Sequence, residues 1–365
     1  MVSVSNHERA RGESTRAPNE SAARAGEALD SAAVDAWLKP RLPQLEGEPE
    51  VTQYSGGASN WTYRLRYAND DVVLRRAPAG TKAAGAHDMA REFRFQQALK
   101  PSFDRVPRML ALCEDATLIG STFYVMERLD GVIPRKELPR DVVLDRAATR
   151  ALCTGALDAL IALHAVDATT PALAAFGKGA GYAQRQIDGW SERYRRARTW
   201  NVPRFTEVMK WLATEVPADG ATCVIHNDYR FDNLVLDRAD PTRIIGVLDW
   251  EMATLGDPLM DVGNSLAYWV QADDDRFIRA MRRQPTHLPG MLTRREVIDY
   301  YAQASGRRSA HWAFYEVYGL FRLAVIVQQI YFRYHQRQTR NPAFRHFWLW
   351  AHYLERRCRK RMRAG

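Results

Sequence analysis

The sequence predicts an α+β protein with two lobes, a small antiparallel-sheet lobe followed by a mostly helical lobe. Short strand-like runs crowd the region up to residue 127, whereas helical spacing of apolar residues dominates the chain beyond it. The chain has 365 residues, of which 46% are hydrophobic, and this is enough for two cores because a single core stops growing near about 250 to 300 residues. We therefore expect residues 31–127 to form the first lobe and residues 128–355 the second, with a basic tail at 356–365.

The first 30 residues are rich in Ala, Ser, Glu and Arg and contain hardly a large apolar side chain, so we expect a disordered arm. They lack the apolar segment of a secretory signal, and nowhere does the chain offer about 18 uninterrupted apolar residues. These patterns predict a cytoplasmic protein with no membrane partner. The widely spaced cysteines predict core thiols and no metal site or disulfide framework: Cys113, Cys153, Cys223 and Cys358.

In the first lobe a short helix is expected from Val34, followed by a sheet. A strand, a turn at Gly56 and Gly57 and a second strand are predicted over residues 53–65. The remaining elements of this lobe are predicted as a strand over 71–76, a helix over 88–99, and strands near 108–112 and 122–126. Residues 127–131 then break the pattern, which indicates a hinge between the lobes.

In the second lobe helical spacing runs over 148–164, 182–215 and 311–335. Strong strand patterns there surround one polar loop. The apolar runs 223–225 and 234–236 flank it and are predicted to pair as strands, and the run 244–248 delivers Asp249 at its end. The loop itself holds Asp228 and, five positions later, Asn233, so three oxygen-bearing side chains are expected to converge.

Together these residues resemble the aminoglycoside phosphotransferase family, which is marked by a His-Gly-Asp-x4-Asn loop and a downstream Asp-Trp or Asp-Phe. The resemblance covers roughly residues 50–335. Four further segments are most similar to the branch found fused to acyl-CoA dehydrogenases: 55–60, 73–76, 91–94 and 256–261. The resemblance implies a protein-kinase-like two-lobe fold and phosphoryl transfer from ATP with Mg²⁺.

The resemblance also implies roles for the loop residues. Asp228 is expected to accept or orient the proton of the attacking hydroxyl, and Asn233 and Asp249 to hold Mg²⁺ through oxygen. His226 joins the catalytic set as the residue that orients the loop by hydrogen bonding. An Asn and an Asp that merely cap a hairpin remain the structural alternative for the metal pair.

For the nucleotide, Arg75 falls where the family usually places a phosphate-binding Lys, and Glu92 falls where a helix Glu would hold it. A guanidinium grips phosphate or carboxylate through two parallel bonds, so function is plausible, and Arg76 is the competing candidate. The other residues expected to bind the nucleotide, through the turn or the hinge backbone, are Gly56, Gly57, Ser59, Asn60, Glu127 and Leu129.

Three neighbours of the loop are expected to shape it. Asn227 replaces the family's usual Gly; Asn tolerates positive φ better than most residues, so the loop geometry can survive, although the side chain would narrow the substrate entrance. Asp257 and Asp261 are expected to brace the site as loop and helix-start residues.

The formal charge of +9 is unevenly spread. The tail 356–363 holds six bases and is predicted to be a solvated helix face, with no nucleic-acid partner because no reading motif accompanies it. The segment 182–198 carries five arginines against Asp188 and Glu192, interleaved with aromatic residues, which favours an anionic acceptor unless it too is a solvated face. Those arginines are Arg185, Arg193, Arg195, Arg196 and Arg198.

These features predict an ATP- and Mg-dependent phosphotransferase acting on a hydroxyl of a small molecule, a hydroxyacyl-CoA or hydroxy acid, with a functional link to an acyl-CoA dehydrogenase. Two alternatives remain. An aminoglycoside or other small-alcohol kinase would share the catalytic residues, and a non-catalytic nucleotide-binding module would fit the missing Lys and Asn227. Protein kinase activity is disfavoured, since the chain has no Asp-Phe-Gly or Ala-Pro-Glu segment.

Overall fold

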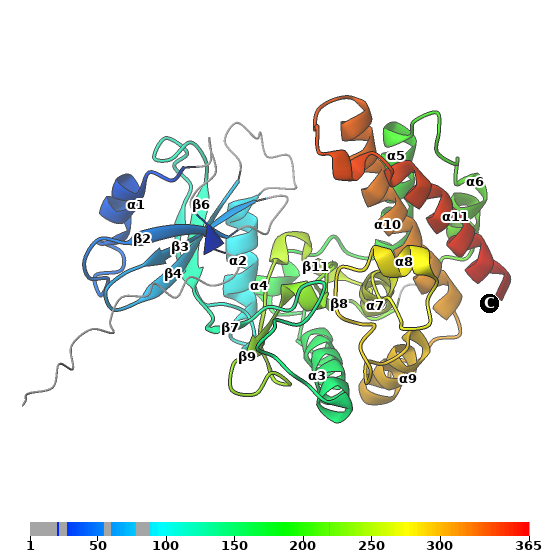
Figure 1. The fold of residues 1–365 in the computed structure, drawn as a ribbon, viewed down its shortest axis with the longest axis horizontal. Helices are drawn as coiled ribbons and strands as arrows, with labels where there is room; N and C mark the ends of the chain where they lie inside the picture. The colour runs from blue at the N-terminus through cyan, green and yellow to red at the C-terminus, as the bar shows by residue number, and fades with distance from the viewer. Residues whose placement is uncertain (1–19, 22–27, 55–59, 78–87, 219, 365) are drawn as a thin grey trace, which may run out of the picture. The chain divides into compact units, whose positions relative to one another are not determined.

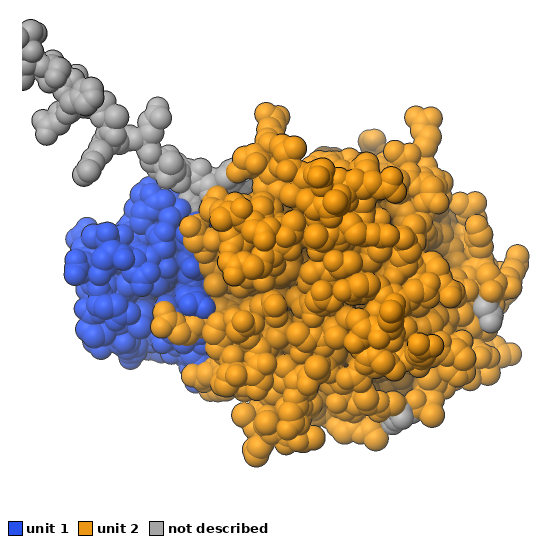
Figure 2. Space-filling view, turned by 90° about the horizontal axis from the view of Figure 1, so that it is seen from below, with its two compact units in different colours: residues 1–93, 109–128 blue, residues 94–108, 129–365 orange. Residues whose placement is uncertain are grey.

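The computed structural model describes residues 20–21, 28–54, 60–77, 88–218 and 220–364, and the chain forms two compact units. Unit 1 comprises Met1–Phe93 and Met109–Arg128, and unit 2 comprises Arg94–Arg108 and Leu129–Gly365 (Figure 2). The division after Arg128 lies one residue from the predicted boundary. Residues 94–108, which we had placed in the first lobe, group with unit 2 because Phe95, Leu99 and Phe103 are buried in its core.

Unit 1 contains an antiparallel sheet with strand order β1-β2-β3-β4-β6-β5 (Figure 1). Its elements are β1 Glu20–Ser21, α1 Ser31–Leu38, β2 Glu50–Tyr54, β3 Trp61–Arg66, β4 Asp71–Arg76, the first half of α2 Met89–Leu99, β5 Met109–Cys113 and β6 Phe123–Glu127. The predicted strands and both helices are found. β1 falls inside the arm that we expected to lack structure, and that expectation is wrong for these two residues because they pair with β2.

The period-2 alternation of β4 explains how the sheet of unit 1 is buried on both faces. Val72 and Leu74 lie in one core with Tyr63 and Phe123, whereas Val73 lies in a second core with Phe93 of α2. The same alternation separates Arg75 from Arg76, which follow one another at the end of the strand. Their side chains therefore leave the sheet on opposite faces.

Unit 2 contains two small sheets and most of the helices (Figure 1). Its strands are β7 Gly131–Val132, β8 Cys223–Ile225, β9 Leu234–Asp237, β10 Ile244–Val247 and β11 Thr254–Gly256. The predicted pairing of 223–225 with 234–236 is wrong: β8 pairs with β11, and β9 pairs with β10 and β7. β8 leads into the polar loop from one of these sheets and β9 follows the loop in the other, so the loop connects the two sheets.

The helices of unit 2 surround these strands. They are α3 Arg146–His164, α4 Pro171–Ala174, α5 Tyr182–Ala197, α6 Thr206–Thr214, α7 Pro258–Ala267, α8 Arg276–Ala280, α9 Arg294–Ser305, α10 Trp312–His335 and α11 Phe347–Ala364. The predicted helix over 182–215 is broken, because the backbone is extended at Arg198 and left-handed at Phe205, with a φ of 52°. The predicted basic tail is the last part of α11.

α10 packs against α5, α7 and α11 and so organises the helical core (Figure 1). Its closest approach is to α7, where Gly263 and Gly319 face one another. A Cβ on either glycine would run into the other helix's backbone, so both positions require Gly. This close crossing brings side chains of α10 next to those of α7, the helix that supports the polar loop.

The four cysteines are buried free thiols, as expected.

Candidate active site

The start of the polar loop is anchored to a buried carboxylate of α7. Asp261 Oδ2 accepts a hydrogen bond from the His226 backbone N–H at 2.8 Å, and Oδ1 accepts one from Asn227 N–H at 2.7 Å. His164 Nε2 lies 3.2 Å from Oδ2 and donates the third bond. Burial disfavours the ionised form of Asp261. The hydrogen bond and charge of His164, together with the contacts of His226, outweigh this effect, so the pKa of Asp261 is lowered. Asp261 therefore braces the loop, as expected.

The His226 ring is buried and both of its nitrogens are engaged. Nε2 lies 3.0 Å from the Leu248 carbonyl and must donate to it, while Nδ1 accepts from the Asp228 backbone N–H at 3.2 Å. The ring centroid is 4.7 Å from that of Trp250, which is fully buried. These contacts fit the orienting role expected for His226, because no ring nitrogen remains for a reacting group.

Asn227 has a φ of 65°, so the Asn tolerated in place of Gly takes the left-handed conformation. Its side chain is also fully used. Oδ1 accepts from the Tyr182 hydroxyl at 3.1 Å and from Asn264 Nδ2 at 3.2 Å, and Nδ2 donates to the Met252 carbonyl at 3.1 Å. The residue thus links α5, α7 and the segment after β10 to the loop.

Asp228 and Asn233 face one another across the loop. Asn233 Nδ2 donates to the Asp228 carbonyl at 2.9 Å and to Asp228 Oδ2 at 3.3 Å. The same oxygen accepts from Arg230 Nη2 at 3.0 Å, and Arg230 Nε lies 3.4 Å from Asp232 Oδ1. Since the amide nitrogen of Asn233 is directed at Asp228, its carbonyl oxygen is left for another partner.

Asp249 follows β10, and the residue before it is hydrogen-bonded to the Asn233 backbone. The Leu248 N–H donates to the Asn233 carbonyl at 2.8 Å, and Asp249 itself has a left-handed φ of 69° at the start of the turn Trp250–Met252. The structure therefore brings together the loop residues that the sequence suggested. Asp228, Asp232 and Asp249 all act on the Arg230 guanidinium; burial works against its charge, but these carboxylates raise its pKa.

The oxygen donors of Asn233 and Asp249 suit a hard cation. Asn233 offers a neutral carbonyl oxygen and Asp249 a carboxylate, which is the donor chemistry that Mg²⁺ prefers. No cluster of three or more His, Cys, Asp or Glu side chains lies at metal-binding spacing in the described part of the chain. At nucleotide sites Mg²⁺ is usually held by one or two protein groups together with substrate phosphates.

Arg75 and Arg76 in unit 1 have different surroundings. Arg75 Nε lies 3.7 Å from Glu92 Oε1, which also accepts from the Tyr124 hydroxyl at 3.0 Å. Arg76 donates to the Ile119 carbonyl at 2.9 Å, and its guanidinium lies 4.7 Å from the Trp61 ring centroid. Arg75 is therefore the arginine that Glu92 positions, whereas Arg76 is occupied on the other face of the sheet.

The remaining nucleotide-site predictions are only partly visible. Gly56, Gly57 and Ser59 lie outside the described residues. Asn60 is buried just before β3, and Glu127 ends β6. The Leu129 side chain covers Gly246 of β10, where a Cβ would strike it.

Sequence reasoning missed several residues that the structure places at the site. Arg230 holds Asp228, and its guanidinium lies 4.6 Å from the Tyr268 ring centroid; its position two residues after Asp228 was the available indication. His164 on α3 supports Asp261, and its Nδ1 is hydrogen-bonded to the Tyr301 hydroxyl at 2.7 Å. Nothing in the local pattern of α3 marks His164, since it ends an ordinary amphipathic helix.

Asp257 also braces the site as a helix-start residue. Its carboxylate caps α7 by accepting from Leu259 N–H at 2.8 Å, and Tyr315 donates to its other oxygen at 3.3 Å. Burial raises its pKa, and these hydrogen bonds only partly oppose that effect. No described contact joins it to Asp228, so it supports the helix and not the reacting groups.

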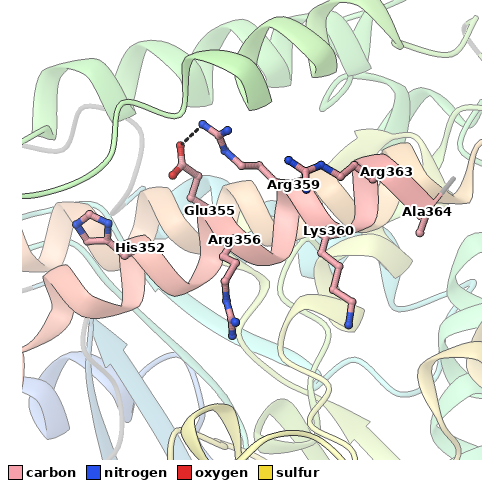
Figure 3. A pocket seen from close by; sticks show the side chains of 7 residues that line it. All are labelled: His352, Glu355, Arg356, Arg359, Lys360, Arg363 and Ala364. Carbon is pink, nitrogen blue, oxygen red and sulfur yellow. Dashed lines mark hydrogen bonds and ion pairs between the residues drawn. The ribbon is translucent and has the colours of Figure 1, made fainter.

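The basic surfaces lie elsewhere in unit 2. A shallow hollow of about 390 Å³ lies along α11, where Figure 3 shows Arg356 and Lys360 leaving the helix on one side and Arg359 and Arg363 on the other. Arg359 pairs with Glu207 at 2.6 Å. A second hollow, of about 770 Å³, lies between α5 and α6. The α11 bases diverge, as on a solvated helix face, and neither hollow includes a residue of the polar loop.

Comparison with known proteins places this site in a family. Residues 50–297 match the model of the phosphotransferase enzyme family. The chain is 35% identical to mouse acyl-CoA dehydrogenase family member 10 over 87% of its length, and 33% identical to human family member 11 over 84%. It spans only 30% and 40% of those two relatives.

Solved structures agree on the fold. A Ralstonia eutropha protein named as a candidate aminoglycoside phosphotransferase is 31% identical, with a TM-score of 0.75 over 90% of this chain and 96% of that one. Choline kinase from Cryptosporidium parvum, at 11% identity, matches with a TM-score of 0.61 over 92% of this chain and 96% of its own. No helix in the described part of the chain is both long and apolar enough to span a membrane. The chain belongs to the phosphotransferase enzyme family and has its kinase-like fold.

Proposed function

We propose that the protein transfers a phosphoryl group from Mg-ATP to a hydroxyl of an anionic small molecule, a hydroxyacyl-CoA or a hydroxy acid. The observations that carry this are the contact between Asp228 and Asn233 in a loop whose backbone is fixed by buried groups, and the backbone hydrogen bond from Leu248 that sets Asp249 next to Asn233. Phosphoryl transfer needs positioning and charge compensation more than covalent help, and this arrangement supplies both.

Asp228 is the group we assign to the acceptor hydroxyl. Its side chain is 20% exposed, so a substrate can reach it, while its backbone N–H is held by His226. A carboxylate within hydrogen-bond reach of the attacking hydroxyl orients it and accepts its proton. Arg230 keeps the carboxylate pointed in one direction, since it bonds the same oxygen as Asn233 does.

We assign Asn233 and Asp249 to Mg²⁺, and Arg75, held by Glu92, to the nucleotide phosphates. Bound there, the ion would neutralise charge on the phosphates and on the leaving group. A solved relative in fold, the aminoglycoside phosphotransferase APH(4)-Ia, is a ternary complex with the ATP analogue AMP-PNP and hygromycin B, which supports ATP as the donor.

The choice of acceptor rests on charge and on the relatives. The names of two matching proteins, acyl-CoA dehydrogenase family members 10 and 11, favour an acyl substrate and a functional link to such a dehydrogenase. Residues 182–198 present more arginines than carboxylates, although Glu192 pairs with Arg196 at 2.7 Å and with Arg195 at 3.8 Å. A surface for a polycationic aminoglycoside would instead show an excess of carboxylates.

A small-alcohol kinase is the second candidate, favoured by the likeness to the Ralstonia protein and to choline kinase. We would incubate the chain with Mg-ATP and separate pools of hydroxyacyl-CoAs, hydroxy acids, aminoglycosides and choline, and detect phosphorylated products by mass spectrometry. Asp228→Asn is the catalytic control. A product only from aminoglycosides or choline would refute the anionic acceptor, and ATP binding without any product would indicate a non-catalytic nucleotide-binding module.

A further inference from the structure

Arg322, in the middle of α10, is a buried charge that nothing in the described part of the chain neutralises. The residue is 3% exposed, and among the described residues no carboxylate lies within ion-pair distance of it and no oxygen accepts a hydrogen bond from its guanidinium. Its guanidinium lies over the Trp190 ring, whose centroid is 5.1 Å from Cζ. A guanidinium stays charged, and burial without an anion is costly, so this residue calls for a partner.

The groups that face Arg322 are mostly aromatic and carry no negative charge at neutral pH. Its charge acts on the hydroxyls of Tyr182 from α5, Tyr318 from α10 and Tyr268 just after α7. The Tyr318 hydroxyl is buried and makes no hydrogen bond of good geometry, because the nearby Trp190 N–H is directed to Gln186 at 3.2 Å. Within the part of the chain that the structure describes, the Arg322 guanidinium and the Tyr318 hydroxyl of α10 therefore have no hydrogen-bond partner.

This region borders the catalytic loop on two sides. Tyr182 donates a hydrogen bond to Asn227, the residue before Asp228. The Tyr268 ring packs against the Arg230 guanidinium, which is hydrogen-bonded to Asp228. Asn264, which also bonds Asn227, has a buried amide oxygen without a partner. Tyr268, which stacks on Arg230 and is acted on by Arg322, is only partly buried and so lies at the edge of this region toward Asp228.

We propose that Arg322 and the Tyr318 hydroxyl bind a negatively charged oxygen group of the acceptor and so hold its hydroxyl at Asp228. This inference rests on the proposed function and names its specificity residue. The ligand chemistry is an oxyanion, either the carboxylate of a hydroxy acid or a phosphate of a hydroxyacyl-CoA. A cationic acceptor is excluded, because an ammonium group beside an unneutralised guanidinium would be repelled.

The decisive variant is Arg322→Met, which keeps the length of the side chain and removes the charge. We would compare kcat/KM for a hydroxy acid with that for its uncharged amide, and for a hydroxyacyl-CoA with that for the shorter hydroxyacyl-pantetheine thioester, which lacks the nucleotide phosphates. The wild-type enzyme is expected to prefer the charged member of one pair by about tenfold or more, and Arg322→Met to lose that preference through KM with little change in kcat. The pair that responds identifies the anion.

Two further variants separate binding from folding. Arg333→Met removes an exposed arginine from the same helix and is expected to leave the preference unchanged. Tyr318→Phe removes only a hydroxyl for which the described residues offer no hydrogen bond. It should therefore keep the thermal stability and weaken binding of the charged acceptor by about threefold. If Arg322→Met fails to fold, Tyr318→Phe alone decides.

Failure of this inference is distinguishable from failure of the proposed function. If wild-type protein turns over acceptors but Arg322→Met and Tyr318→Phe keep the same preference for charge, Arg322 is a structural cation packed on Trp190 and the inference is wrong. If no acceptor is phosphorylated, the hydroxy acid and the hydroxyacyl-CoA are used as ligands in thermal unfolding. A rise in Tm for the wild type that Arg322→Met lacks supports the site, and equal shifts overturn it.

Discussion

Asp261 and Asp228 are two carboxylates of one loop system, and their contacts differ in kind. Asp261 is fully buried, and its oxygens accept three hydrogen bonds, from two backbone N–H groups and from His164. Asp228 is partly exposed and shares Arg230 with Asp232. The first carboxylate is satisfied by buried groups of the protein, whereas the second lies where a substrate can reach it, beside a further carboxylate.

This difference separates what builds the loop from what reacts in it. A carboxylate that is satisfied before any ligand arrives stabilises the fold, and its loss should appear first in stability. A carboxylate that a substrate can reach acts on that substrate, and its loss should appear first in turnover. Substitutions that keep the shape of each side chain test this division.

Asp228→Asn is expected to have the largest effect, on activity. The amide cannot accept the hydroxyl proton, so kcat should fall by about 10² to 10⁴ fold while thermal unfolding changes little. The measurement is steady-state turnover of ATP and acceptor beside a melting curve. Turnover close to that of the wild type would show that Asp228 is not the catalytic group.

Asp261→Asn is expected to have the largest effect on stability. One backbone N–H would lose its acceptor, and the ring of His164 would lose a buried anion, at a cost of about 3 kcal/mol in the free energy of unfolding. Urea denaturation measures it. Asp299→Asn, which breaks an exposed pair with Arg295 on α9, is the matched control and should stay within about 0.5 kcal/mol.

The contribution of Asp261 should also depend on pH in a defined direction. Because its pKa is lowered in the folded chain, the unfolded chain binds the proton first as the pH falls. The stabilisation is therefore complete above the ordinary value of 3.8 and is lost as the pH drops below it through the folded pKa. The stability difference between wild type and Asp261→Asn should shrink on acidification below 3.8; a constant difference would mean that the carboxylate charge is irrelevant.

Asp257 sharpens the same comparison, since burial raises its pKa where that of Asp261 is lowered. The folded chain then holds the proton more tightly than the unfolded chain, so stability falls as the pH rises from 3.8 through the folded pKa. Asp257→Asn can still cap α7 through its amide oxygen. Relative to wild type, Asp257→Asn should gain stability as the pH is raised through this window. Urea denaturation at several pH values measures this difference.

The elements that sequence reasoning predicted are those whose information is local. The run Asp71–Arg76 predicts β4 with the bounds that the structure has. The resemblance links Arg75 to Glu92, and the structure places the two side chains 3.7 Å apart. The partner of β8 was missed because β11 has three residues and no alternation, so only tertiary contacts select it.

Arg322 shows a different limit. It is a single charge inside the apolar run of α10, which is visible in the sequence, but whether such a residue is paired depends on carboxylates from distant segments. The same holds for His164 and Asp261, which lie 97 residues apart. A local pattern predicts where a side chain sits on its helix and not which charge it meets.

Asn227→Gly is expected to have the smallest effect, and it tests whether side-chain contacts or backbone anchoring hold the loop. Glycine adopts a positive φ without strain, which would raise the free energy of unfolding by about 0.5 to 1 kcal/mol. The substitution would also leave the Tyr182 hydroxyl and the Asn264 amide without their acceptor. We expect a net loss of about 1 kcal/mol. Asn227→Ala loses the same contacts without relief of φ and should be about 1 kcal/mol less stable again.

Turnover should survive in Asn227→Gly, because Asp261 still accepts from the backbone N–H at this position. If the variant folds with wild-type stability but no longer turns over, the Asn227 side chain contributes to the reaction and not only to the frame. The division between the satisfied carboxylate and the reactive one would then have to be redrawn to include the amide that joins Tyr182 and Asn264 to the loop.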